Sequence, residues 1–331
     1  MALPLGNPQL EQAIEPRLEL VEERLRDAVA QSDRLADATS RHLVDAGGKR
    51  LRPMLTLLTA QLGEGSRPEV LDAAVVVELT HLATLYHDDV MDSAPTRRGA
   101  PAAHEVWGNS VAILTGDLLF ARASRVVAGL GPDAVRIQAE TFERLCLGQL
   151  HETVGPAEGE DPVEHYVQVL ADKTGSLIAT SARFGAMFAG CDRDTVSRVT
   201  QYGEFAGVAF QIADDVLDVR SDAEVSGKTP GTDLREGVAT MPVLLLRQRV
   251  LAGTASDSDR ELLAAIEGDL SGDVALGEVI AGLRAHDVVD ETAEMARVWS
   301  ERAKEAVKDL SESAVKDAML AFADAMVARA T

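Results

Sequence analysis

The chain has 331 residues, of which 46% are hydrophobic, so a large core can form without disulfides or a structural metal. Only Cys146 and Cys191 are present, without the spacing of a zinc site, which indicates a reducing, cytoplasmic location. A formal net charge of −22 would repel nucleic acid, so any phosphate ligand must bind through metal ions or a local basic cluster. The first residues lack the regions of a signal peptide, and no segment has the roughly 20 apolar residues of a transmembrane helix.

Apolar residues recur every three or four positions along most of the chain, and no β-type alternation is sustained, so we expect a nearly all-helical protein. The first helix is expected over residues 8–44, and Gly47 and Gly48 end it. Further helices are expected over residues 53–62, 69–92, 116–127, 132–152, 162–190 and 195–219. Polar loops are expected over residues 152–162 and 220–237. Amphipathic helices return from Met241 onward, and because no Gly/Ser linker divides the chain we expect one domain over residues 1–331.

The segment DDVMD begins with Asp88 and ends with Asp92, four positions later. On a helix, both carboxylates lie on one face about one turn apart, and they repel each other unless a cation lies between them. Magnesium is the natural candidate, because it prefers carboxylate oxygens and keeps coordination positions for water and substrate phosphates. Alone, such a motif is more typical of a solvated helix end.

The same arrangement is repeated in the segment DDVLD, where Asp214 and Asp218 again share one face of a helix. Both motifs fall near the C-terminal end of an expected helix, where backbone carbonyl groups attract cations. A pair of such motifs favours two facing stacks of carboxylates that hold metal ions around one diphosphate.

Basic residues accompany both motifs. The glycine-rich turn GGKRLRP places Lys49, Arg50 and Arg52 at a helix start, where backbone N–H groups and cations suit phosphate oxygens. Arg97 and Arg98 follow the first aspartate motif and offer two guanidinium groups beside it. Each feature alone also fits a turn with exposed charges, but their grouping beside the aspartate pairs favours a diphosphate site.

Further polar positions extend this set of candidate ligands. Lys173 and Thr174 lie within the otherwise apolar segment DKTGSLIAT, where a lysine can also extend to solvent. Lys228 follows the second aspartate motif in a polar loop and is similar to a cation that closes on a ligand. A lone helical histidine is more often a core residue, but His81 lies seven residues before Asp88 on the same helix face and is placed to donate a hydrogen bond to a second diphosphate.

Six segments follow one another in a characteristic order: GGKRLRP, HLATLYHDDVMDSAPTRRGAPAAH, GNSVAILTGDLLFARA, DKTGSL, FQIADDVLD and GKTPGTDLREG. Over about residues 40–245 the chain thereby resembles the trans-isoprenyl diphosphate synthases, also called the polyprenyl synthetase family. The resemblance implies an all-α isoprenoid synthase fold, which is an antiparallel helical bundle around a deep central cavity, and a homodimer.

The resemblance also implies a role for individual residues. The residues implied to bind isopentenyl diphosphate are Lys49, Arg52, His81 and Arg98. Those implied to bind the allylic diphosphate are Arg97, Lys173, Thr174, Gln211 and Lys228. The implied ligands of about three magnesium ions per active site with substrate bound are Asp88, Asp92, Asp214 and Asp218. The implied catalytic set is Asp88, Asp92, Lys173, Thr174, Gln211, Asp214 and Lys228. Val238 stands where relatives often carry a lysine, and the missing cation either weakens the expected binding of the allylic diphosphate or is replaced by Lys228.

The implied reaction is a head-to-tail (1′-4) trans-prenyl transfer. Metal ions and cations stabilise the departing diphosphate, so the allylic C–O bond ionises, the double bond of isopentenyl diphosphate attacks, and the released diphosphate accepts the proton that is lost. One alternative is a class I terpene cyclase, which has an aromatic-lined cavity, whereas only 4% of these residues are aromatic. Another is a non-catalytic helical subunit, which would lack some of the aspartates or cations.

Product length in the family depends on the positions four and five residues before the first aspartate. In this chain these positions are Thr84 and Ala83. Both are small, so they leave the product tunnel open at that level. Each further turn of open helix, about 5.4 Å, admits roughly one more isoprene unit, which predicts a medium- or long-chain product of roughly six to ten units. Tyr86 is a possible constriction, and a short-chain farnesyl or geranylgeranyl diphosphate synthase is the alternative.

Overall fold

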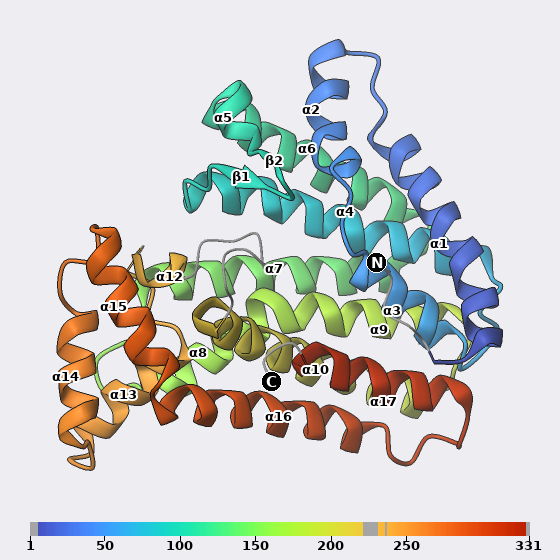
Figure 1. Ribbon diagram of the computed structural model, residues 1–331. Helices are drawn as coiled ribbons and strands as arrows, with labels where there is room; N and C mark the ends of the chain where they lie inside the picture. The colour runs from blue at the N-terminus through green and yellow to red at the C-terminus, as the bar shows by residue number, and fades with distance from the viewer. Residues whose placement is uncertain (1–5, 221–230, 236, 329–331) are drawn as a thin grey trace. The chain divides into compact units, whose positions relative to one another are not determined.

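The computed structural model describes residues 6–220, 231–235 and 237–328 (Figure 1). Helices make up most of these residues, and the strands among them are β1 (Thr96–Arg97) and β2 (Ala100–Pro101), which pair antiparallel. The prediction of an all-α protein is confirmed. Within the same described ranges, no helix is long and apolar enough to cross a membrane.

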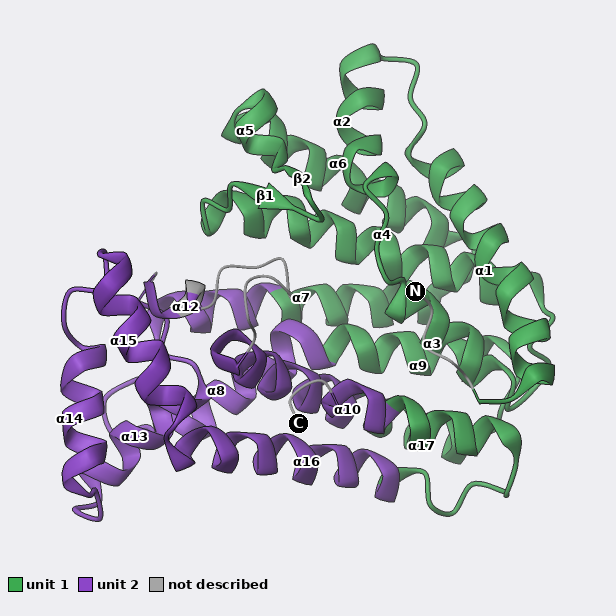
Figure 2. Ribbon diagram, viewed as in Figure 1, with its two compact units in different colours: residues 1–145, 176–203, 306–322 green, residues 146–175, 204–305, 323–331 purple. Residues whose placement is uncertain are grey.

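The chain divides into two compact units, which Figure 2 distinguishes by colour. Unit 1 consists of residues 1–145, 176–203 and 306–322. Unit 2 consists of residues 146–175, 204–305 and 323–331. The single domain expected from the sequence stays a prediction.

In unit 1, α4 (Pro68–Met91) is buried along most of its length and packs against α3 (Leu51–Ala60), α6 (Asn109–Ala128) and α9 (Ser176–Phe188). Other helices with residues in unit 1 include α1 (Pro8–Val29), α2 (Arg34–Asp45), α5 (Ala103–Trp107), α7 (Pro132–Val154), α10 (Arg193–Arg220) and α17 (Ala314–Val327). A core cluster of this unit contains Val76, Val77, Ile137, Leu177 and Phe184. The largely apolar buried part of α4 therefore brings its polar C-terminal end to a defined place in unit 1.

The helix expected over residues 8–44 is two helices, so that prediction is wrong. The first ends at Val29, and Ala30 is extended with φ −60° and ψ 135°. The side chain of Asp33 then accepts a hydrogen bond from the backbone N of Ala36 at 2.9 Å and begins α2. A capping aspartate favours a new helix start over continuation of the old helix.

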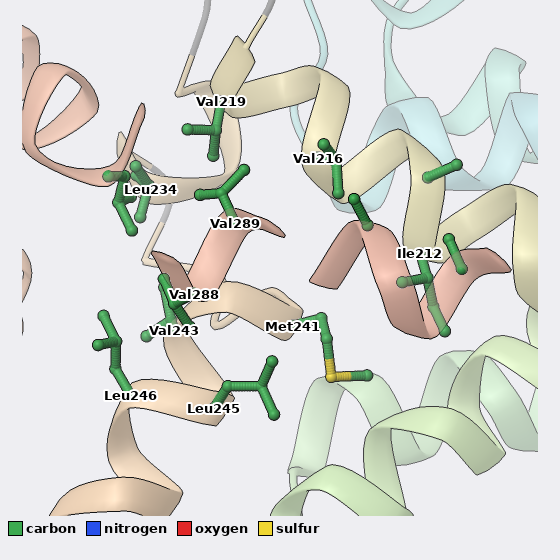
Figure 3. Close-up of a cluster of buried hydrophobic side chains, with 14 of the residues drawn as sticks. Ile212, Val216, Val219, Leu234, Met241, Val243, Leu245, Leu246, Val288 and Val289 are labelled. Carbon is green, nitrogen blue, oxygen red and sulfur yellow. The ribbon is translucent and has the colours of Figure 1, made fainter. Parts of the chain in front are cut away.

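Unit 2 packs around the C-terminal part of α10. Figure 3 shows its core, in which Ile212, Val216 and Val219 of α10 belong to one cluster with Val288 and Val289. The helices that surround it are α8 (Pro162–Leu170), α12 (Thr232–Arg235), α13 (Met241–Leu251), α14 (Asp257–Ile266), α15 (Asp273–Arg284) and α16 (Asp287–Ala306). This core fixes the helix that carries the second aspartate motif.

The helix expected over residues 162–190 is interrupted by a π-helical turn, η1 (Ala171–Gly175). This turn contains Lys173 and Thr174. A Cβ atom at Gly148 of α7 would lie 2.7 Å from the backbone N of Lys173, so glycine is needed there for η1 to approach α7. π-helical turns inside α-helices are frequent at functional sites.

Candidate active site

The first aspartate motif lies at the C-terminal end of α4, as expected. Asp92 is the residue that follows the last helical residue, and its backbone N donates a hydrogen bond to the carbonyl O of Asp88 at 2.8 Å. The side chain of Asp88 is partly buried and that of Asp92 is exposed. The carbonyl groups at this helix end favour a bound cation beside the two carboxylates.

The second residue of the same motif, Asp89, points away from solvent and was not among the predicted site residues. Its side chain is 1% exposed, and its Oδ1 accepts a hydrogen bond from Nε of Arg97 at 2.6 Å. Its Oδ2 is buried without a hydrogen-bond partner among the described residues. Burial raises the pKa of Asp89, and the Arg97 guanidinium opposes that rise. Asp89 therefore orients Arg97. In the sequence, its position between Asp88 and Asp92 was the only indication that it belongs to the site.

The basic residues of the turn that contains Lys49 differ in their burial and in their ion pairs. The side chain of Lys49 is exposed, whereas Arg50 is 5% exposed and pairs with Glu22 and Glu78. Arg52 is partly buried, and its Nε has no hydrogen-bond partner in the part of the chain that the structure describes. Burial lowers the pKa of Arg52 to about 10, although the carboxylate of Glu78 acts in the opposite direction. Lys49 and Arg52 are thus the members of the turn that suit an anionic ligand.

Arg98 is brought to this turn from a distant part of the sequence. Its Nη1 donates to the carbonyl O of Leu43 at 2.9 Å and to the carbonyl O of Gly47. A Cβ atom at Gly48, where φ is 147°, would lie 2.8 Å from Cζ of Arg98. A side chain at the second glycine of the turn would therefore displace the guanidinium from this position.

His81 lies among the arginines of this region. Burial lowers its pKa well below the ordinary value, and Arg52, Arg98, Arg97 and Arg50 lower it further. The imidazole is therefore neutral near pH 7, and it can donate a hydrogen bond to an anion without carrying a charge. The structure thus brings Arg52, His81 and Arg98 close enough to influence one another electrostatically.

The second aspartate motif lies in the C-terminal part of α10. Asp214 and Asp218 are partly buried, and Gln211 lies one turn before Asp214 on the same helix face. Asp215, which is 5% exposed, accepts hydrogen bonds from Oη of Tyr166 at 3.0 Å and from the backbone N of Met241 at 3.1 Å. In both motifs the buried second aspartate holds neighbouring structure, and the other two aspartates are partly buried or exposed.

The remaining predicted residues have different surroundings. Nζ of Lys173 pairs with the carboxylate of Glu152, and Thr174 is buried. The side chain of Val238 is exposed, so the segment after α12 presents no cation at that position. Lys228 lies outside the described residues.

The product-length positions lie in the buried part of α4. Ala83 is buried, and the hydroxyl of the partly buried Thr84 donates to the carbonyl O of His81 at 2.9 Å. The hydroxyl of Tyr86 donates to the carbonyl O of Thr39 and accepts from the backbone N of Leu43 at 3.3 Å. Tyr86 is therefore held against α2.

Comparison with known proteins identifies close relatives over the full chain. The family model described as Polyprenyl synthetase matches residues 33–276, which extends beyond the motif-bearing part predicted from the sequence. A nonaprenyl diphosphate synthase of Mycobacterium tuberculosis is 42% identical over 326 residues, which cover 98% of this chain and 96% of that protein.

Solved structures give the same result. The geranylgeranyl pyrophosphate synthase of Corynebacterium glutamicum, complexed with calcium and isoprenyl diphosphate, is 41% identical with a TM-score of 0.86 and covers 99% of both chains. A decaprenyl diphosphate synthase of Rhodobacter capsulatus is 31% identical, has a TM-score of 0.86, and covers 99% of this chain and 100% of that one. The predicted isoprenoid synthase fold and the predicted prenyltransferase class are confirmed. The chain belongs to the polyprenyl synthetase family.

Proposed function

We propose that this protein condenses isopentenyl diphosphate with an allylic diphosphate, releases diphosphate, and makes an all-trans polyprenyl diphosphate of medium or long chain length. The observation that carries the proposal is the grouping of Arg52, Arg98 and neutral His81 in the same unit as the outward carboxylates of Asp88 and Asp92. This grouping supplies cations for one diphosphate and metal ligands for another.

The donor sets fit magnesium. Each motif offers two carboxylates one helical turn apart, and oxygen is the ligand atom that magnesium prefers. We place about three magnesium ions at Asp88, Asp92, Asp214 and Asp218, where the metal would neutralise charge on the leaving diphosphate. The calcium in the Corynebacterium glutamicum structure supports a divalent metal.

The chain's own residues would divide the two substrates. Isopentenyl diphosphate would bind to the cations Lys49, Arg52 and Arg98 and accept a hydrogen bond from His81. The residues proposed for the allylic diphosphate are Arg97, Lys173, Thr174, Gln211 and Lys228. The hydroxyl of Thr174 and the side-chain carbonyl of Gln211 would offer partial negative charge to the allylic cation without acting as nucleophiles.

The small side chains of Ala83 and Thr84, and the attachment of Tyr86 to α2, support a medium or long product. The name of the Mycobacterium tuberculosis relative supports it too. A short-chain product is the second candidate, because a geranylgeranyl pyrophosphate synthase is 41% identical to this chain.

The test is incubation of the purified protein with magnesium, labelled isopentenyl diphosphate and allylic diphosphates of different length, followed by chromatography of the dephosphorylated products. We expect products of roughly thirty carbons or more, which is six isoprene units. Products that stop at fifteen or twenty carbons would favour the second candidate. No incorporation with any starter, by folded protein, would refute the proposed reaction.

We also propose a homodimer in which α6 contributes to the contact. Ile113 and Leu114 are exposed, and Ala121, seven residues after Leu114, is exposed on the same face of the helix. A second copy would remove these apolar side chains from water. Light scattering after size-exclusion chromatography should give about twice the mass of one chain, and Leu114→Glu should shift the protein to the monomer.

Two further expectations stay proposals. The two units would act as one polyprenyl synthetase domain, which is supported by relatives that match 98% of the chain as a whole. A cytoplasmic location is supported by the free thiols of Cys146 and Cys191.

A further inference from the structure

Arg50 is the basic residue of the glycine-rich turn that faces inward. Its Nε and Nη2 pair with the carboxylate of Glu22, and its Nη1 donates to Oε1 of Glu78 at 2.8 Å. It also donates to the carbonyl O atoms of Val44 at 3.1 Å and Gly47 at 3.4 Å. These contacts use all three nitrogen atoms of the guanidinium, so Arg50 serves to hold the turn.

Glu78 connects this residue to Arg98. The Glu78 side chain is 2% exposed, and its Oε1 lies 2.8 Å from Nη1 of Arg50 and 3.7 Å from Nη2 of Arg98. The two arginines also share an acceptor, because both donate to the carbonyl O of Gly47. One buried carboxylate and one backbone oxygen therefore join three segments: the turn, the segment after β1, and α4.

The charge of Glu78 is needed because the cations around it repel one another. Arg50 and Arg98 each approach the same atom, and Arg52 lies close enough that Glu78 raises its pKa while Arg98 lowers it. Without substrate, a buried carboxylate is the group that keeps such cations together in a region of low dielectric constant. It also lies three residues before His81 on α4, so the same helix positions both side chains.

We propose that Glu78 is a positioning residue for isopentenyl diphosphate: it holds Arg98 and the turn that carries Lys49 and Arg52 in the arrangement that binds the diphosphate. This inference rests on the proposed function of those cations. Prior placement of the cations removes the cost of assembling them when the substrate arrives.

The effect should be confined to one substrate. Arg97, which is proposed to bind the allylic diphosphate, pairs with Asp89 and has no contact with Glu78 among the described residues. Glu22 offers a matched control, because it pairs with Nε and Nη2 of Arg50, and among the described contacts none joins it to Arg98. Its side chain is 25% exposed, so solvent can compensate for its loss.

The experiment compares wild-type protein with Glu78→Gln and Glu22→Gln. Steady-state assays give the KM of each substrate, calorimetry gives the affinity for isopentenyl diphosphate alone, and thermal unfolding gives Tm. For Glu78→Gln we expect the KM and Kd for isopentenyl diphosphate to rise about tenfold, while the allylic KM changes by less than about twofold. For Glu22→Gln we expect both KM values to stay within about twofold, whatever its Tm.

An unchanged KM for isopentenyl diphosphate in folded Glu78→Gln, or an equal rise in both KM values, would overturn the positioning role. If Glu78→Gln does not fold, Glu78→Asp replaces it, because this variant keeps the charge and shortens the side chain. We expect it to raise only the KM for isopentenyl diphosphate, by about threefold, and an unchanged value would again overturn the role. Failure of the wild-type protein to bind or incorporate isopentenyl diphosphate would refute the proposed function itself, which is a separate result.

Discussion

Replacement of Asp215 with alanine should destabilise unit 2 without removing a metal ligand. The carboxylate accepts hydrogen bonds from Oη of Tyr166 and from the backbone N of Met241, the first residue of α13. Each hydrogen bond to a charged group contributes about 1.5–3 kcal/mol. An acidic group at a helix N-terminus adds about 0.3–1 kcal/mol. Removal of a buried charge offsets a few kcal/mol of this sum, so we expect a net loss of about 2–4 kcal/mol in the free energy of unfolding.

Urea unfolding followed by the fluorescence of Trp299 measures this loss, because Trp299 packs against the core of unit 2. Trp107 belongs to unit 1, so the experiment is done in a Trp107→Phe background. Asp214→Asn is the matched control on the same helix. We expect it to reduce turnover at least about a hundredfold, as a proposed metal ligand, and to unfold at nearly the wild-type urea concentration.

Asp215→Ala should keep turnover within about tenfold of wild type at temperatures where Trp299 reports a folded unit 2. The reasoning from its hydrogen bonds is refuted if Asp215→Ala unfolds like wild type. It is refuted equally if the folded variant loses as much activity as Asp214→Asn, because Asp215 would then act on the substrate or metal.

Three other changes test the region around α4. Gly48→Ala should weaken isopentenyl diphosphate binding about tenfold in calorimetry, because its Cβ would lie 2.8 Å from Cζ of Arg98. Both Gly47 and Gly48 have a positive φ, so both alanine variants carry backbone strain, but a Cβ at Gly47 meets no atom within 4 Å. Equal losses of affinity in the two variants would therefore contradict the clash. Because the pKa of His81 is lowered in the folded chain, below about pH 6.5 the unfolded chain binds a proton that the folded chain does not. The free energy of unfolding therefore decreases as the pH is lowered. His81→Gln should reduce the dependence of the urea midpoint on pH between about pH 5 and 6.5. If the plots of urea midpoint against pH are parallel for the wild type and the variant, this would argue against a neutral His81. Thr84→Phe should shorten the product by at least one isoprene unit of about 5.4 Å, and an unchanged chromatographic profile would exclude Thr84 from the tunnel wall.

Local spacing was sufficient to predict the all-helical class and the two aspartate pairs that share a helix face. Residues four apart on a helix share a face whatever the rest of the fold, so Asp88 with Asp92 and Asp214 with Asp218 follow from the sequence. The helical class was predicted from apolar periodicity, and the prenyltransferase class from the resemblance of six ordered segments to a known family. The break after Val29 was missed, since apolar periodicity describes a helix face better than a helix end.

The role of each neighbouring charge depended on tertiary contacts. The sequence places Arg50 and Arg52 alike in one basic turn, yet Arg50 meets a carboxylate 28 residues away that turns it inward. Asp89 and Asp215 look like metal ligands beside their neighbours, but each is buried and held by a partner outside its own motif. Arg98 reaches the carbonyl O of Gly47 across 51 residues of sequence. The sequence by itself determined which chemical groups are present and which of them share a helix face, because those properties are local. Only the tertiary structure decided which charges are buried against partners and which are exposed, because burial and long-range pairing depend on the packing of whole helices.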